Sequence, residues 1–309
     1  MRLEPEDFEA LVAQAMQVPG HQNMRPVIEK ELLHYDMLFA LEQDGLLDGL
    51  TFQGGTSLRL CHGASRFSED LDFVGGHHFA SSQVAEIKHC LEHYISRRYQ
   101  LDVLVKEPAE LRQDPDYADV RVDKWQLAIV TAPARRDIPK QRIKLDIANV
   151  PAYTREPRPL RLNYDFLPDG YRDTLVMMES LDEIMADKLV SLVNNQRYVR
   201  HRDIWDLAWL AQQGAEVEIG LLHHKLEDYR VEGYLAKAKQ RQGQLAYIVQ
   251  GRPFQQEMAR FLPQEVLERT LYKAKFSDYL INTVAELIGR VIQQLYDGQV
   301  SEPAPPFQM

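Results

Sequence analysis

The segment FQGGTSLRLCHGASRFSEDLDF, residues 52–73, decides the fold that we expect for this chain. It places a turn of small residues one short helix ahead of two carboxylates, Asp70 and Asp72. Two glycines followed by a hydroxyl residue let backbone N–H groups approach phosphate oxygens, and a helix that begins there presents its positive end to the same anion. The predicted phosphate-binding residues of this turn are Gly54, Gly55 and Thr56.

Asp70 and Asp72 lie one residue apart in a stretch with the character of a strand. Alternate side chains of a strand share a face, so the two carboxylates should point together while Leu71 and Phe73 enter the core. A third acid, Asp146, lies in a second strand-like run, IKLDIANV. Carboxylate oxygens suit Mg²⁺, so we expect the three acids to converge on a metal site.

Other interpretations of these acids stay open at the level of the residues. A DxD pair is also typical of glycosyltransferases that hold a nucleotide sugar, and it can be two solvated acids at the end of a strand. Asp146 can likewise be an edge-strand acid in water. The glycine turn upstream of the pair favours the nucleotide site over the glycosyltransferase site.

The composition is that of a folded protein with two domains. The chain has 309 residues, of which 45% are hydrophobic and 27% are charged, and this length exceeds the usual size of one core. Its opening segment is acidic and amphipathic, and no apolar run is long enough to span a bilayer, so we expect a cytoplasmic protein without membrane contact. Two cysteines are too few for a disulfide framework.

The charge distribution is uneven along the chain. A formal net charge of -10 argues against a protein that coats nucleic acid through bulk electrostatics. Between residues 121 and 161, however, ten Lys or Arg residues stand against four acids. That stretch could face a phosphate backbone, or it could form a solvated hairpin rim of snorkelling basic side chains.

The apolar pattern predicts an α+β fold, in which a mixed sheet with flanking helices is followed by a helical C-terminal domain. Strand-like runs are expected at residues 99–106, 122–131 and 142–149, and a helix from Leu181 to about Val193. The expected domains are N-terminal helices in 1–47, the sheet-containing core in 48–165, the helical domain in 166–300 and a flexible tail in 301–309.

The stretch GGTSLRL followed by RFSEDLDF resembles the first signature of the nucleotidyltransferase fold in the AbiEii family, the toxins of type IV toxin–antitoxin systems. The later stretch ADKLVSLVNNQRYVRHRDIWDL, residues 186–207, is similar to further motifs of that family, a Lys on one helix and an Arg-Asp pair on the next. The resemblance implies an enzyme that transfers a nucleotide from an NTP to RNA, with tRNA as the favoured acceptor, and releases pyrophosphate. It also implies an antitoxin protein as a possible partner.

The resemblance assigns roles to the residues of the first signature. The glycine turn would hold the triphosphate, while Asp70 and Asp72 would bind two metal ions, Mg²⁺ or alternatively Mn²⁺. Asp146 would complete the metal site and take the position of the base that accepts a proton from the attacking hydroxyl. Arg66 and Ser68, just upstream, are expected to contact a phosphate, with Ser68 on the same strand face as Asp70.

The resemblance also assigns roles in the later stretch. Lys188 beside an apolar helix face would by itself be a snorkelling surface residue, but the motif places it near the β- and γ-phosphates, where it offsets charge on the leaving pyrophosphate. Asp203 is expected to position Lys188 or a substrate hydroxyl. Asp206, three residues later, is expected to cap the helix or to pair with Arg202 instead.

Two alternatives to RNA as the acceptor stay open. The same chemistry could transfer the nucleotide to a protein side chain. The fold could also serve a noncatalytic module that binds nucleotide or a partner protein, although Asp70, Asp72 and Lys188 argue for an enzyme.

Overall fold

The computed structural model describes residues 6–108, 120–135 and 137–301, with side chains as far as residue 297. The predicted tail lies outside the described residues from residue 302 onward. The chain forms two compact units, which we call unit 1 (Met1–Ser180 and Ala259–Arg269) and unit 2 (Leu181–Met258 and Thr270–Met309). None of the described helices is both long and apolar enough to cross a membrane.

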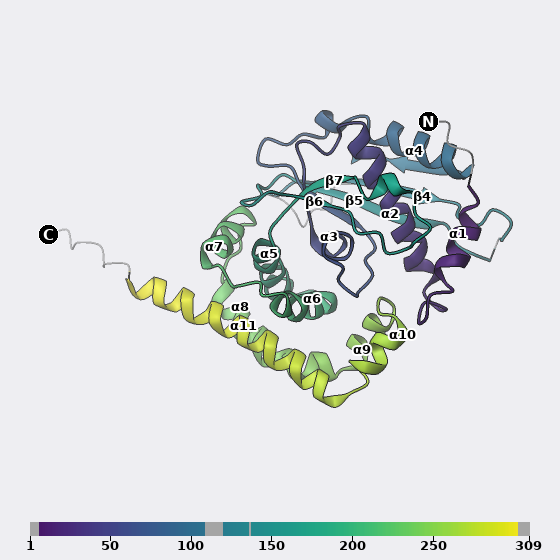
Figure 1. Cartoon of the computed structure of the whole chain (residues 1–309). Helices are drawn as coiled ribbons and strands as arrows, with labels where there is room; N and C mark the ends of the chain where they lie inside the picture. The colour runs from purple at the N-terminus through teal and green to yellow at the C-terminus, as the bar shows by residue number, and fades with distance from the viewer. Residues whose placement is uncertain (1–5, 109–119, 136, 302–309) are drawn as a thin grey trace. The chain divides into compact units, whose positions relative to one another are not determined.

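Unit 1 is built on a mixed sheet (Figure 1). The sheet has seven strands in the order β3-β4-β5-β2-β1-β7-β6. The pairs β2–β5 and β1–β7 are parallel, and the other neighbouring pairs are antiparallel. The predicted α+β fold with a mixed sheet is confirmed. The strands are β1 (Thr51–Gln53), β2 (Leu71–Val74), β3 (Val103–Lys106), β4 (Val122–Ile129), β5 (Gln141–Ala148), β6 (Glu156–Pro159) and β7 (Leu175–Met178).

Helices of unit 1 pack against one another and against the sheet. α2 and α4 pack against each other, α4 also packs against β3, and α3 begins where β1 ends and packs on β1 and β2. Residues of β4 and β5 alternate between buried and accessible, as expected when one face of these strands lies in the core. The α-helices are α1 (Phe8–Ala15), α2 (Arg25–Gln43), α3 (Gly54–His62), α4 (Ile87–Tyr99) and α10 (Gln264–Arg269).

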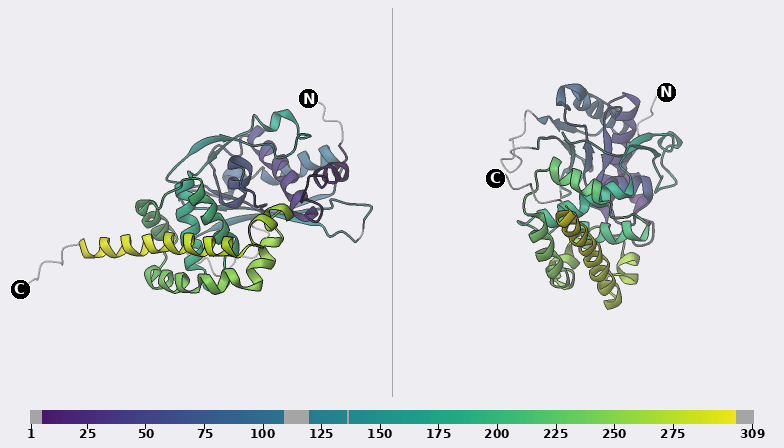
Figure 2. Two further views of the ribbon diagram at one scale, coloured as in Figure 1. Left: turned by 60° about the horizontal axis from the view of Figure 1, so that its bottom comes forward. Right: turned by 90° about the vertical axis from the view of Figure 1, so that its left-hand side faces the viewer.

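Unit 2 is helical over its described residues. The 28-residue α11 packs along α8 and α6, and α5 packs against α6, α7 and α8 (Figure 2). α5 begins at the predicted residue and ends one residue later than expected. The helices are α5 (Leu181–Asn194), α6 (His201–Gln212), α7 (Ile219–Asp228), α8 (Tyr234–Gln250), α9 (Arg252–Ala259) and α11 (Ala274–Ser301).

The strand predictions were wrong in two places. α4 continues to Tyr99, so only the second half of the run 99–106 is a strand. β6 and β7 were not expected, and residues 166–180, which were expected to open the helical domain, contain β7 and lie in unit 1. β6 reads EPRP, and prolines occur in strands at sheet edges, where β6 lies. β6 and β7 each have four residues, which is too few for a clear alternation of apolar side chains.

Candidate active site

The three acids predicted to converge do so in unit 1. Asp72 in β2 and Asp146 in β5 are direct partners across a parallel ladder. Asp70 immediately precedes β2, and its Oδ1 accepts a hydrogen bond of 3.0 Å from the backbone N–H of Lys144 in β5. Leu71 is buried beneath them, as the strand alternation predicts. Two of the carboxylates are therefore side by side on neighbouring strands, and the third is held immediately before β2.

Asp146 lies in surroundings that a bound cation would suit. Burial, and next the charge of Asp72, raises the pKa of Asp146 to about 7, although Lys124 opposes the shift. The Oδ1 atom of Asp146 is buried and has no hydrogen-bond partner among the described residues. A buried carboxylate without donors is costly unless a positive charge compensates it. This oxygen donor set fits a divalent cation such as Mg²⁺.

The glycine turn lies directly against these acids. Gly54 has φ +77°, and a Cβ added there would lie 2.8 Å from the Oδ2 atom of Asp72. A Cβ added at Gly55 would lie 2.2 Å from Nη2 of Arg66. The backbone at the start of α3 can therefore approach the Asp72 carboxylate and the Arg66 guanidinium only because it carries no side chains.

Two hydroxyl groups fix the start of α3 to the acids. The Oγ1 atom of Thr56 donates a hydrogen bond of 2.5 Å to the backbone carbonyl of Asp70. The hydroxyl of Ser57, which was not predicted as a site residue, donates to the carbonyl of Gly54 at 2.8 Å. The Thr56 side chain thus holds the glycine turn in position relative to the carboxylates.

Arg66 and Ser68 lie in the loop that connects α3 to β2. Both side chains are buried, and Nη1 of Arg66 donates to the carbonyl of Phe67 at 2.7 Å. The Oγ atom of Ser68 faces Gly55, at 3.1 Å from the position of an added Cβ. Since Ser68 precedes the strand, the alternation expected to align it with Asp70 does not apply.

Sequence reasoning missed the residues that anchor this loop. The Nζ atom of Lys30 on α2 lies 2.9 Å from Oε1 of Glu69, and Arg260 lies 3.8 Å from the same oxygen. The backbone N–H of Phe67 donates to the carbonyl of Phe261 at 2.9 Å. These partners are far from the loop in sequence, and nothing in their local pattern indicates the contact.

A buried histidine of α2 also holds the loop and makes the stability of unit 1 depend on pH. Nε2 of His34 lies 3.0 Å from the carbonyl of Glu69, and burial lowers the pKa of His34 to about 4. The folded state therefore disfavours the charged imidazole, and its stability should fall as pH decreases from 6.5 toward 4, by about 3 kcal/mol.

Urea unfolding of the wild-type protein and of His34→Gln at several pH values measures this prediction. We expect the variant to lose that pH-dependent part of the free energy of unfolding. An equally steep decline in the variant would assign the effect to other groups.

Lys188 of unit 2 is held by both acids of the following helix. Its Nζ atom, on α5, lies 2.7 Å from Oδ1 of Asp203 and 3.0 Å from Oδ2 of Asp206 on α6. The lysine is largely buried rather than snorkelling on the surface. Asp206 was expected to act apart from Lys188, and the structure instead gives the lysine two carboxylate partners.

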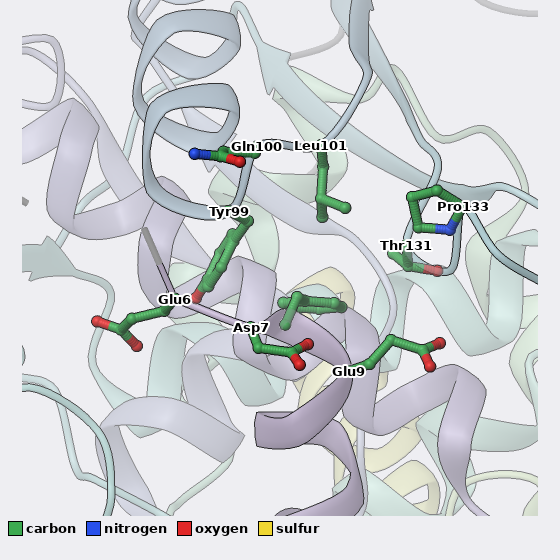
Figure 3. Close-up of a pocket in the computed structure, with 9 residues that line it drawn as sticks. Glu6, Asp7, Glu9, Tyr99, Gln100, Leu101, Thr131 and Pro133 are labelled. Carbon is green, nitrogen blue, oxygen red and sulfur yellow. The ribbon is translucent and has the colours of Figure 1, made fainter. Parts of the chain in front are cut away.

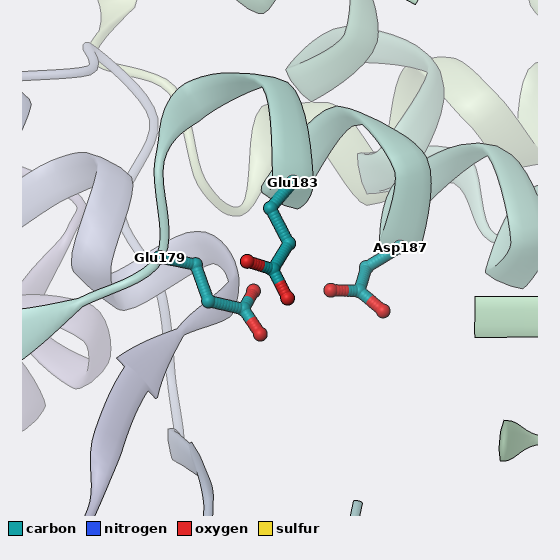
Figure 4. Close-up of side chains that lie close together, drawn as sticks. All are labelled: Glu179, Glu183 and Asp187. Atoms are coloured by element: carbon teal, nitrogen blue, oxygen red, sulfur yellow. The ribbon is translucent and has the colours of Figure 1, made fainter. Parts of the chain in front are cut away.

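A second buried lysine of unit 2 lies within ion-pair distance of two acids. Glu183 and Asp187 lie one turn apart on α5, and Glu179 precedes the helix in the chain (Figure 4). Acids of this kind can bind a cation, but Nζ of the fully buried Lys225 lies 2.7 Å from Glu183 and 3.0 Å from Asp187. The chain itself thus supplies one positive charge to this cluster.

We expect Lys225→Met to destabilise unit 2 by about 3–5 kcal/mol, because it leaves two acids uncompensated in the interior. Chemical unfolding followed by circular dichroism measures this loss. Lys225→Met combined with Glu183→Gln and Asp187→Asn should recover part of the stability. A single variant as stable as wild type would contradict the importance of these ion pairs.

A separate pocket of about 410 Å³ in unit 1 involves other residues (Figure 3). Its acids are already engaged. Glu6 lies 3.1 Å from Arg98, Glu9 lies 2.7 Å from Arg25, and Asp7 caps α1. None of the predicted site residues lines it. The lining residues are Glu6, Asp7, Phe8, Glu9, Tyr99, Gln100, Leu101, Thr131 and Pro133.

The chain shares its fold with one solved structure and is similar over most of its length to two others. MenT4, a nucleotidyltransferase toxin from Mycobacterium tuberculosis H37Rv, is 16% identical, with 94% of this chain and 97% of that chain covered and a TM-score of 0.57. JHP933 from Helicobacter pylori is 17% identical, covering 89% of this chain and 97% of its own, with a TM-score of 0.43. A putative nucleotidyltransferase from H. pylori is 20% identical, covering 87% and 97%, with a TM-score of 0.45. No curated protein matches the chain significantly.

The sequence match is more specific than the shared fold. Residues 36–289 match the family described as "Nucleotidyl transferase AbiEii toxin, Type IV TA system". That range contains the glycine turn, the three acids of unit 1 and the Lys188 cluster of unit 2. The chain is therefore a nucleotidyltransferase and belongs to the AbiEii family of type IV toxin–antitoxin systems.

Proposed function

We propose that this protein is a Mg²⁺-dependent toxin that transfers a nucleoside monophosphate from an NTP to RNA, with tRNA as the favoured acceptor. Its family supports the use of an NTP for nucleotidyl transfer. The observation that carries the proposal is the pairing of Asp72 with Asp146 across β2 and β5, with the backbone of Gly54 directly against Asp72. This arrangement combines a place for cations with a place for polyphosphate.

In the proposed reaction, a hydroxyl oxygen of the acceptor attacks the α-phosphorus of the NTP. A new phosphorus–oxygen bond forms, the bond from the α-phosphorus to the oxygen bridging to the β-phosphate breaks, and pyrophosphate leaves with that electron pair. The hydroxyl proton must pass to a base. We assign Asp146 to this position, because its buried oxygen has no hydrogen-bond partner among the described residues.

Asp70, Asp72 and Asp146 are the residues that would hold the metal ions, with Mn²⁺ as an alternative to Mg²⁺. Nucleotidyltransferases in general use divalent metals, which when bound stabilise charge on the phosphate oxygens. The turn at Gly54 offers backbone N–H groups to the triphosphate. We assign Lys188, by family resemblance, to the charge of the leaving pyrophosphate.

The partner and the location complete the proposal. Type IV toxin–antitoxin membership implies an antitoxin. We propose that the reaction takes place in the cytoplasm, where NTP and tRNA are both present. The antitoxin would then act there on the toxin or on its product.

Incubation with NTPs labelled at the α-phosphate, in the presence of Mg²⁺ and total RNA, tests the acceptor. We expect label in material that ribonuclease destroys and protease does not. Label that follows the polypeptide would assign a protein acceptor. Binding of NTP without transfer to any acceptor would indicate a noncatalytic module, and transfer from a sugar nucleotide would indicate a glycosyltransferase.

A further inference from the structure

The strands that carry Asp146 present a solvent-accessible face rich in positive charge. In β5, Arg142 and Lys144 alternate with buried Ile143 and Leu145, and both are exposed on the same side as Asp146. Lys144 lies one alternation from Asp146, about 7 Å along the strand. We call the following set the basic face: Leu104, Lys106, Lys124, Gln126, Ala128, Arg142 and Lys144.

The strand register places these side chains in three rows, the first of which contains Asp146. Lys124 is the partner of Asp146 across β4–β5. In the next row, Lys144 pairs with Gln126, which in turn pairs with Lys106 of β3. A third row runs from Arg142 of β5 to Ala128 and Leu104. The cations thus extend outward from the three acids over three adjacent strands.

These charges are not explained by the packing of unit 1. Arg142, Lys144 and Lys106 form no ion pair with another described residue, whereas Arg25, Arg98 and Lys30 are all paired. A lysine on an edge strand discourages pairing with another sheet. This effect alone can explain why a lysine occupies position 106, because β3 is an edge strand. β5 lies between β4 and β2, so that reason does not apply to Arg142 and Lys144.

We infer that the basic face binds the phosphate backbone of the acceptor nucleic acid and leads its reacting hydroxyl toward Asp146. The inference rests on the proposed function, because it names the surface that an RNA acceptor would use. Charge complementarity favours a polyanion, and the continuity of the rows with the acids favours the acceptor strand over a ligand bound elsewhere. A protein with a net charge of -10 needs such a local surface to bind nucleic acid at all.

The double variant Arg142→Gln/Lys144→Gln tests this assignment. The control is the double variant Lys88→Gln/Arg97→Gln, which removes the same amount of positive charge from α4. Binding of total tRNA is measured over a range of salt concentrations. We expect the first variant to lose about tenfold in affinity near 0.1 M salt, and the slope of log K against log salt to fall by roughly 1.4–1.8. The control on α4 should change neither quantity by more than about twofold.

Binding of Mg²⁺–NTP and the kinetics of transfer separate this inference from the proposed function. We expect unchanged NTP binding and a raised KM for tRNA, with kcat nearly preserved. Unchanged tRNA binding, equal losses in both variants, or loss of binding to polyglutamate instead of tRNA would overturn the inference. If the wild-type protein transfers nucleotide to no acceptor, the proposed function fails. The tRNA titration still decides in that case whether the basic face binds nucleic acid.

Discussion

Asp72→Asn is expected to lower the rate of nucleotidyl transfer by about 10³-fold while the protein stays folded. Asparagine has nearly the same shape as aspartate, so it can occupy the space beside Gly54 and opposite Asp146 without a clash. It removes the negative charge on which cation binding depends. The loss should appear mainly in kcat, because the interaction matters most where charge develops in the transition state.

Transfer of label from an α-labelled NTP measures this effect, with circular dichroism to confirm the fold. Glu156→Gln is the matched control, because it removes one acid from an exposed position of β6, where Glu156 pairs with the exposed Arg158. That variant should keep its activity within about twofold. An Asp72→Asn protein within tenfold of wild type would show that the carboxylate is not part of the reacting site.

Gly54→Ala is expected to reduce activity by about 100-fold, through displacement of the Asp72 carboxylate. The backbone there has φ +77°, and a Cβ would lie 2.8 Å from the Oδ2 atom of Asp72. An alanine in this region costs about 1–2 kcal/mol in backbone strain alone. The added methyl group must also push the carboxylate out of position or shift the start of α3.

Alanine substitutions at two other glycines separate the effect of backbone strain from that of displacing the Asp72 carboxylate. Gly76 has φ +82° with no atom within 4 Å of an added Cβ, so Gly76→Ala carries the strain without the displacement. Gly49 has open space and no positive φ, so Gly49→Ala carries neither. Transfer rates and thermal unfolding are compared for all three. If Gly76→Ala lost as much activity as Gly54→Ala, backbone strain rather than the carboxylate contact would be responsible.

The arrangement of the acids could be predicted from the sequence because it depends on local rules. Asp72 lies in β2 and Asp70 immediately precedes it, and the backbone N–H of Lys144 in β5 holds the Asp70 carboxylate, so the expected pairing of the two acids needed only a short extended segment. Asp146 required the further assumption that its strand is a neighbour, and the β2–β5 ladder confirms that assumption. The turn at Gly54 was recognisable because consecutive glycines before a helix have a specific backbone use.

The supports of the site could not be predicted, because they join residues that are distant in sequence. Glu69 contacts Lys30 of α2 and Arg260 of the segment Ala259–Arg269, a pairing that only the tertiary fold produces. Asp203 and Asp206 both form ion pairs with Lys188, because both face the same side of α6. Choosing one acid over the other from sequence had no physical basis, since residues three apart on a helix share a face.

Asp70, immediately before β2, Asp72 in β2 and Asp146 in β5 are proposed to hold divalent cations beside the glycine turn. A crystal structure with Mn²⁺ and a nonhydrolysable NTP, with the metal located by anomalous scattering, tests this claim most directly. We predict Mn²⁺ coordinated by Asp70, Asp72 and Asp146, as two ions roughly 3.5–4 Å apart, with the triphosphate on the backbone N–H groups at Gly54. Metal and triphosphate bound away from these residues would contradict the account.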